Sequence, residues 1–276
     1  MFKTRLLSGI VLVILLFAII LPGGYLLLGS LWLISLVAFW ELSKASGLHT
    51  EEKKVNALET MGYLWITVYY GMLALGIAPG TTLLILPLGL MSMLFVYVVT
   101  FPKYRAETIM SAFFCMAYAP ISLSAVYLTR ELVHGAYLVW LIFISSWVCD
   151  TCAYCVGRLL GKHKLAPVLS PKKSIEGAIG GVVGSAIVGV LYAVFALART
   201  ATFPGMVPAI AVISAIGAIL SQVGDLAASG IKRDKQIKDY GNLIPGHGGI
   251  MDRFDSVIYV SPVIYILSVV MLGILA

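Results

Sequence analysis

Apolar residues occupy most of the chain in long runs, and short polar segments separate these runs. About nine runs have roughly the 20 residues that a helix needs to cross a bilayer. They cover residues 6–21, 24–41, 61–78, 81–101, 108–129, 135–157, 174–198, 206–229 and 255–275. A transmembrane barrel would instead show short segments of alternating polarity. We therefore predict an all-α fold, a polytopic helical membrane protein with about nine transmembrane helices.

The first run is interpreted as a membrane span and not as a cleaved signal peptide. Lys3 and Arg5 precede it, as in a signal peptide, but it has no small-x-small cleavage site. It continues through Pro22-Gly23-Gly24 into the second run, which predicts a tight helical hairpin.

Composition and charge agree with a membrane protein and suggest its orientation. The 276 residues are 60% hydrophobic and 12% charged, whereas a soluble domain has about 25% charged residues. With the N-terminus in the cytoplasm, all of the 19 Lys and Arg residues except Arg130 and Arg199 fall in cytoplasmic segments. This basic face would attract anionic lipid headgroups and nucleotides. Nucleic acid is not an expected partner, because the chain has no soluble domain.

The chemistry is concentrated in the second half of the chain. Residues 1–134 are expected to form a transmembrane scaffold, with segment 41–60 as a solvated charged linker. Residues 135–276 are expected to form the catalytic region, because ionisable residues enter the spans there and usually mark function. The four cysteines are interpreted as apolar helix-packing residues and not as a zinc site or disulfides: Cys115, Cys149, Cys152 and Cys155.

Two polar elements open this catalytic region. Asp150 shares a helix face with Tyr154 and Gly157, and it is either part of a polar cavity or a structural ion-pair partner. The segment Ser170-Pro-Lys-Lys-Ser-Ile-Glu-Gly177 predicts a helix start with Ser174 as N-cap. Free helix N–H groups beside two ammonium groups form an anion site, so Ser170, Lys172 and Lys173 are candidate phosphate ligands. The plainer interpretation of the lysines is positive-inside charge.

The glycines that follow favour close helix packing. Gly177 and Gly181, and likewise Gly180 and Gly184, are pairs spaced by four residues. Such pairs let membrane helices approach closely.

The span 206–229 carries a polar stripe. Ser221, Gln222, Ser229 and Lys232 fall within about 60° of Asp225 on a helical wheel. The stripe predicts one wall of a polar cavity that reaches the cytoplasmic surface. The alternative is a hydrogen-bonded seam between helices.

A basic run, a glycine turn and two aspartates come next. Lys232, Arg233 and Lys238 offer cations for phosphate groups. The turn Pro245-Gly-His-Gly-Gly249 offers backbone N–H groups for a phosphate nest, which makes Gly248 and Gly249 candidate ligands. His247 is interpreted as a substrate-binding residue of this turn and not as an acid–base catalyst.

The aspartates suggest a metal site. Asp252 and Asp255 share a helix face, and with Asp225 they offer oxygen ligands to Mg²⁺, which usually takes one or two carboxylates together with phosphates and water.

The same residues resemble a known family. Ser229-x-x-Lys-Arg-x₄-Lys-Asp followed by Pro245-Gly-His-Gly-Gly-x-x-Asp-Arg-x-Asp255 is similar to the signature of the phosphatidate cytidylyltransferases, the CDP-diacylglycerol synthases. Asp150-x-x-Ala-Tyr-x-x-Gly157 and Ser170-Pro-Lys-Lys-Ser-x-Glu-Gly177 also resemble elements of that family. The resemblance covers roughly residues 145–256.

The resemblance implies a Mg²⁺-dependent reaction of CTP with phosphatidate that gives CDP-diacylglycerol and pyrophosphate. It also implies a homodimer in the bacterial inner membrane, and the basic cytoplasmic loops place the active site on the cytoplasmic side. We expect Asp225 and Asp252 as first metal ligands, with Asp255 and Asp150 as further ligands or holders of a second cation. Lys232, Arg233 and Lys238 are expected to bind CTP phosphates. A CTP-dependent polyprenol or phytol kinase and an ion-coupled transporter are the alternatives.

Overall fold

A computed structural model describes residues 2–49, 55–196, 205–246 and 248–273. The chain forms two compact units. Unit 1 comprises Met1–Ser124 and Lys235–Arg253, and unit 2 comprises Ala125–Asp234 and Phe254–Ala276. Both units are therefore assembled from segments that are distant in the sequence.

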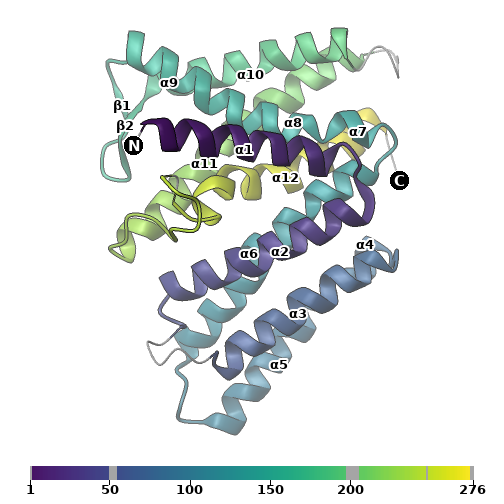
Figure 1. Cartoon of the computed structure of the whole chain (residues 1–276), viewed down its shortest axis with the longest axis vertical. Helices are drawn as coiled ribbons and strands as arrows, with labels where there is room; N and C mark the ends of the chain where they lie inside the picture. Colours follow the sequence, from purple (N-terminus) through teal and green to yellow (C-terminus); the bar gives the residue numbers. More distant parts are fainter. Residues whose placement is uncertain (1, 50–54, 197–204, 247, 274–276) are drawn as a thin grey trace. The chain divides into compact units, whose positions relative to one another are not determined.

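Unit 1 is a layer of helices with a loop from the C-terminal half added to it. Its elements are α1 (Phe2–Ile20), α2 (Gly24–Ala45), α3 (Ala57–Ala74), α4 (Pro79–Thr82), α5 (Ile85–Thr100), most of α6 (Ala106–Glu131) and residues 235–253. Helix α3 packs against both α2 and α5 (Figure 1). The Tyr70 hydroxyl is 2.8 Å from the hydroxyl of Ser35 and donates to the carbonyl of Pro120 at 3.0 Å. These buried hydrogen bonds join α3 to α2 and α6.

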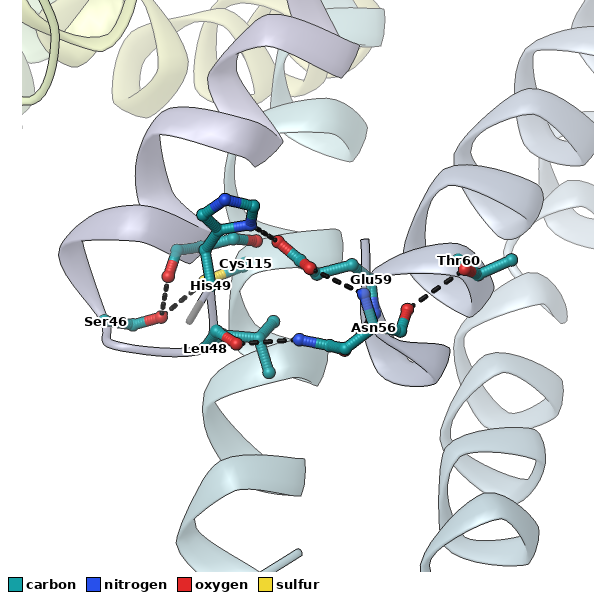
Figure 2. A network of polar contacts seen from close by, with 8 residues as sticks. Ser46, Leu48, His49, Asn56, Glu59, Thr60 and Cys115 are labelled. Atoms are coloured by element: carbon teal, nitrogen blue, oxygen red, sulfur yellow. Dashed lines mark hydrogen bonds and ion pairs between the residues drawn. The ribbon is translucent and has the colours of Figure 1, made fainter. Parts of the chain in front are cut away.

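The connection between α2 and α3 holds a network of polar contacts (Figure 2). The side chain of Asn56 caps α3, because its Oδ1 atom accepts from the Glu59 backbone amide at 3.0 Å. The backbone N–H of Asn56 in turn donates to Glu59 Oε2 at 3.0 Å. His49 Nδ1 lies 2.8 Å from Glu59 Oε1. The expectation that segment 41–60 is a solvated linker is wrong for Glu41 and Glu59, which are 0% and 1% exposed. Residues 50–54 lie outside the described residues.

Unit 2 contains the helices that carry most of the predicted chemistry. Its elements are the end of α6, α7 (Gly135–Leu138), α8 (Trp140–Phe143), the π-helical turn η1 (Ile144–Val148), α9 (Cys149–Leu160), β1 (Lys164–Ala166), β2 (Ser170–Ser174), α10 (Ile175–Phe195), α11 (Met206–Asp234) and α12 (Met251–Leu272) from Phe254 onward. Helix α10 packs along α9 and against α11, and the two short strands connect α9 to α10 (Figure 1). This small antiparallel hairpin was not predicted from the sequence.

The glycines of α10 allow the close approach of α9. A Cβ atom placed on Gly180 would lie 2.6 Å from side-chain atoms of Val156, and one placed on Gly184 would lie 2.5 Å from the sulfur of Cys152. The predicted packing role of these glycines is therefore confirmed. All four cysteines are free, and Cys115 and Cys149 are buried.

Seven of the described helices are long and apolar enough to cross a membrane: Gly24–Ala45, Gly80–Thr100, Ala106–Glu131, Gly135–Leu160, Ile175–Phe195, Met206–Asp234 and Met251–Leu272. The predicted runs 6–21 and 61–78 correspond to α1 and α3, which are helical but are not among these seven. The helical, multi-pass architecture is thus confirmed. A total of nine spans and a cytoplasmic N-terminus stay predictions, as does the division of the chain at residue 134.

Candidate active site

The β1–β2 hairpin fixes two of the predicted phosphate ligands beside a helix N-terminus. Strand β2 ends at Ser174, whose hydroxyl accepts from the Gly177 amide at 3.1 Å, so the predicted N-cap is confirmed. In the first turn of α10, Glu176 accepts from the Lys162 amide at 3.1 Å and lies 2.6 Å from His163 Nδ1. The loop after α9 is therefore tied to the start of α10, with Lys172 and Lys173 on the strand that leads into it.

A cavity of about 390 Å³ lies in this part of unit 2. Helices α9, α10 and α11 and strands β1 and β2 supply its lining. The lining includes the predicted residues Asp150, Ser170, Lys172 and Lys173 together with Tyr154, Arg158 and Leu165. Cationic, hydroxyl and apolar side chains thus meet in one space. Such a lining suits a ligand with both an anionic and an apolar part.

Lys173 forms an ion pair with Asp225, which joins β2 to α11. The two side chains are only 24% and 28% exposed. Asp255 is 8% exposed and accepts from the Ser256 amide at 2.8 Å, and Asp225, Asp150 and Lys232 lie close enough to act on it electrostatically. Three predicted acidic residues therefore share one region of unit 2.

This arrangement is compatible with a divalent cation whose coordination shell is completed by phosphate groups of the substrate. Among the described residues, no group of three or more His, Cys, Asp and Glu side chains forms a ready metal site. Mg²⁺ does not need one, because it usually binds one or two carboxylates plus phosphates and water. Asp225 and Asp255 carry hard carboxylate oxygens of the type that Mg²⁺ binds. Asp225 is already paired with the Lys173 ammonium group, which a cation bound here would have to displace or share.

The polar stripe of α11 serves two purposes. Gln222 donates to the Ala178 carbonyl at 3.1 Å, so this residue is part of the helix–helix seam that was the alternative interpretation. Ser229 and Lys232 are half-buried nearer the end of α11, and Arg233 is exposed in its last turn. The cations of this run therefore lie at the end of the helix and remain accessible.

In unit 1, Asp252 organises the glycine turn. Its Oδ2 atom accepts from the Gly249 amide at 3.0 Å and from the Tyr240 amide at 2.8 Å. Gly246 and Gly248 have φ values of 76° and 86°, a left-handed backbone that favours glycine. The Ile244 amide closes the turn by donating to the Gly248 carbonyl at 2.9 Å. His247 lies outside the described residues.

The same loop borders a second cavity, of about 500 Å³. Its lining includes Lys238, Asp239, Asn242, Gly248 and Arg253. In contrast to the cavity of unit 2, loop residues and few apolar side chains surround it. It offers two cations and a glycine backbone to an anionic, water-soluble ligand.

One residue of this region was missed by the sequence analysis. Glu41, near the end of α2, accepts from the Ile250 amide at 3.0 Å and from the Met251 amide at 2.8 Å. The signal was a carboxylate four residues before the end of an apolar helix, but it was interpreted as the start of a linker.

Comparison with known proteins gives this geometry its context. Residues 3–271 match the cytidylyltransferase family. The chain belongs to this family of nucleotidyl-transferring enzymes. It is 32% identical over 272 residues to a phosphatidate cytidylyltransferase of Staphylococcus saprophyticus, covering 97% of this chain and 99% of that protein.

Other cytidylyltransferases give the same result. The phosphatidate cytidylyltransferase of Staphylococcus aureus is 34% identical over 271 residues, which is 97% of this chain and 99% of that protein. The phosphatidate cytidylyltransferase of Staphylococcus haemolyticus is 32% identical over 272 residues, which is 98% of this chain and 100% of that protein. The resemblance inferred from the motifs is thereby confirmed, and it extends into residues 1–134.

Proposed function

We propose that this protein transfers CMP from CTP to phosphatidate and so produces CDP-diacylglycerol and pyrophosphate. Near-full-length similarity to proteins named phosphatidate cytidylyltransferase supports the reaction. The observation that carries the proposal is the cavity in unit 2, where Lys172, Lys173 and Ser170 lie among side chains of apolar helices. Phosphatidate matches this lining, because it joins an anionic phosphate to apolar acyl chains.

The two cavities suggest how the substrates are divided. The cavity of unit 2 takes the phosphate of phosphatidate, because α9, α10 and α11 are apolar membrane helices that can accommodate the adjoining glycerol and acyl groups. The cavity of unit 1 takes phosphates of CTP through Lys238, Arg253 and the N–H groups of the glycine turn. Lys232 and Arg233, at the end of α11, also bind CTP phosphates.

The reaction needs charge neutralisation more than proton transfer. A phosphate oxygen of phosphatidate, already anionic at neutral pH, forms a bond to the α-phosphorus of CTP. The bond from this phosphorus to the β-bridging oxygen breaks, and its electron pair leaves with pyrophosphate. No general base is required, and the chain's task is to align the two anions and offset their repulsion.

Carboxylates and a cation share this task. Asp225, Asp252 and Asp255 would hold Mg²⁺, and Asp150 would be a ligand for a second cation. When bound, Mg²⁺ neutralises phosphate charge and favours departure of pyrophosphate. The lysine and arginine side chains also neutralise phosphate charge, and they do so without transferring protons.

The resemblance and the charge pattern support a further proposal about assembly and location. It acts as a homodimer in the inner membrane, with its active site on the cytoplasmic side, where CTP is available.

One assay tests the function. Purified protein is incubated with phosphatidate, Mg²⁺ and each nucleoside triphosphate in turn, and pyrophosphate and liponucleotide are measured. We expect both products in equal amounts with CTP. Release of CDP would instead indicate a lipid kinase, and solute flux into proteoliposomes without CTP consumption would indicate a transporter.

A further inference from the structure

Glu41 lies at the start of α12 although it is far away in the sequence. It is 209 and 210 residues before the two amides that it accepts, those of Ile250 and Met251. Glu41 lies on α2 and is fully buried. Each oxygen therefore has a backbone donor at the N-terminus of α12, where free N–H groups and the helix dipole favour an anion.

Two glycines allow this close approach. A Cβ atom on Gly249 would lie 2.3 Å from Oε1 and 2.5 Å from Oε2 of Glu41, and one on Gly241 would lie 2.3 Å from Oε1. Neither glycine is among the residues with positive φ. A side chain at either position would therefore have to displace the Glu41 carboxylate, although the backbone conformation there does not demand glycine.

Glu41 and Asp252 hold the same two stretches of backbone. Asp252 binds the amides of Tyr240 and Gly249, while Glu41 contacts the next residue along in each stretch, Gly241 and Ile250. Displacement of Glu41 would therefore release the end of the glycine turn and the first turn of α12 that carries Asp252.

We infer that Glu41 is a positioning residue for CTP and metal binding. It fixes the glycine turn and Asp252, so that the loop N–H groups and the Asp252 carboxylate keep the orientation needed for the nucleotide phosphates. The inference rests on the proposed function for its kinetic consequence. Its structural part concerns only contacts within unit 1. The first half of the chain then supplies the active site with a specific carboxylate in addition to its scaffold.

Glu41→Gln is the decisive substitution, because glutamine keeps the size of the side chain but replaces one acceptor oxygen with a donor NH₂ group. Glu59→Gln is the matched control. Glu59 is also a buried glutamate of unit 1 that accepts a backbone amide, but its partners are His49 and Asn56 (Figure 2).

Kinetics with CTP and phosphatidate in mixed micelles separate positioning from general stability. For Glu41→Gln we expect kcat/KM for CTP to fall about ten-fold or more, with KM for CTP raised at least about three-fold, since misplacement of phosphate-binding groups weakens nucleotide binding and alignment. KM for phosphatidate should stay within about two-fold. Glu59→Gln should leave KM for CTP unchanged.

Amide hydrogen exchange of residues 240–253 in detergent, without substrate, provides a readout independent of activity. Exchange should be faster in Glu41→Gln than in the wild type or Glu59→Gln. If the wild type makes no liponucleotide, the proposed function fails while this measurement still tests the position of Glu41. Unchanged exchange, unchanged KM for CTP, or an equal loss for both substrates overturns the inference.

A second pair of variants applies if Glu41→Gln does not fold. Gly241→Ala places a methyl group against Oε1 of Glu41, whereas Gly29→Ala, on α2 itself, meets no atom of the described residues within 4 Å. The inference requires Gly241→Ala to accelerate exchange of residues 240–253, and Gly29→Ala not to do so. Exchange is the readout for this pair, because Gly241 itself lines the cavity of unit 1 and its substitution could change KM for CTP directly. Equal behaviour of the two alanine variants overturns it.

Discussion

The ion pair between Lys173 and Asp225 offers a test that separates stability from catalysis. Asp225→Asn leaves an unpaired ammonium group, and Lys173→Met leaves an unpaired carboxylate. The double variant removes both charges and keeps similar side-chain volumes. Comparison of the four proteins in a double-mutant cycle isolates the contribution of the pair.

The expected loss of stability follows from the partial burial of the two side chains. Exposed ion pairs contribute about 0–1 kcal/mol, whereas removal of one partner from a buried pair costs about 3–5 kcal/mol. With exposures of 24% and 28%, each single variant should lose about 2 kcal/mol, or roughly 4–8 °C in melting temperature for a chain of this size. The double variant should recover most of this loss, because it leaves no buried charge without a partner.

Turnover should not recover in the same way. If Asp225 is a metal ligand, Asp225→Asn should reduce kcat about 100-fold or more, and the double variant should be at least as slow, because Lys173 is itself proposed to bind phosphate. Melting is followed by differential scanning fluorimetry in detergent, and turnover by pyrophosphate release across a Mg²⁺ titration. A double variant with wild-type turnover would show that the pair is only structural, and the metal assignment of Asp225 would be refuted.

Three further predictions test other parts of the argument. Asp252→Asn should lower kcat about 100-fold while it preserves the glycine turn, since asparagine retains an acceptor oxygen for the Tyr240 and Gly249 amides; faster exchange of residues 240–253 would contradict this. Gly180→Ala should cost about 1–3 kcal/mol through overpacking against Val156, measured as a lower melting temperature that Gly180→Ala combined with Val156→Ala partly restores. The reaction should invert configuration at the α-phosphorus of chiral thiophosphate CTP, because no covalent intermediate is proposed; retention would require one.

Local signals in the sequence predicted local features correctly. The Ser174 cap and the packing role of the α10 glycines depend on residues a few positions apart, and both are confirmed. The apolar runs also predicted where the long helices lie, but not their ends: the run 61–78 is the helix Ala57–Ala74, and the run 206–229 continues to Asp234. The resemblance of the motifs to cytidylyltransferases is confirmed over nearly the whole chain.

Features that depend on distant residues could not be predicted. Glu41 accepts from amides more than 200 residues away, and backbone amides carry no side-chain signature. The partner of Asp225 is another example, since Lys173 lies on a different element that is distant in the sequence. The β1–β2 hairpin has short strands whose burial does not alternate from residue to residue, so it lacks the pattern by which strands are recognised.

The π-helical turn at Ile144–Val148 determines which side chains of the following helix, α9, face each neighbouring helix. A π turn contains about one residue more than an α turn, so deletion of a single residue here would restore regular α-helical pairing without breaking the helix. The same deletion would rotate everything after it by about 100° relative to α8. Asp150, two residues past the turn, would then face a different neighbour, so a chain shortened by this one residue could keep its helices and still lose its cavity.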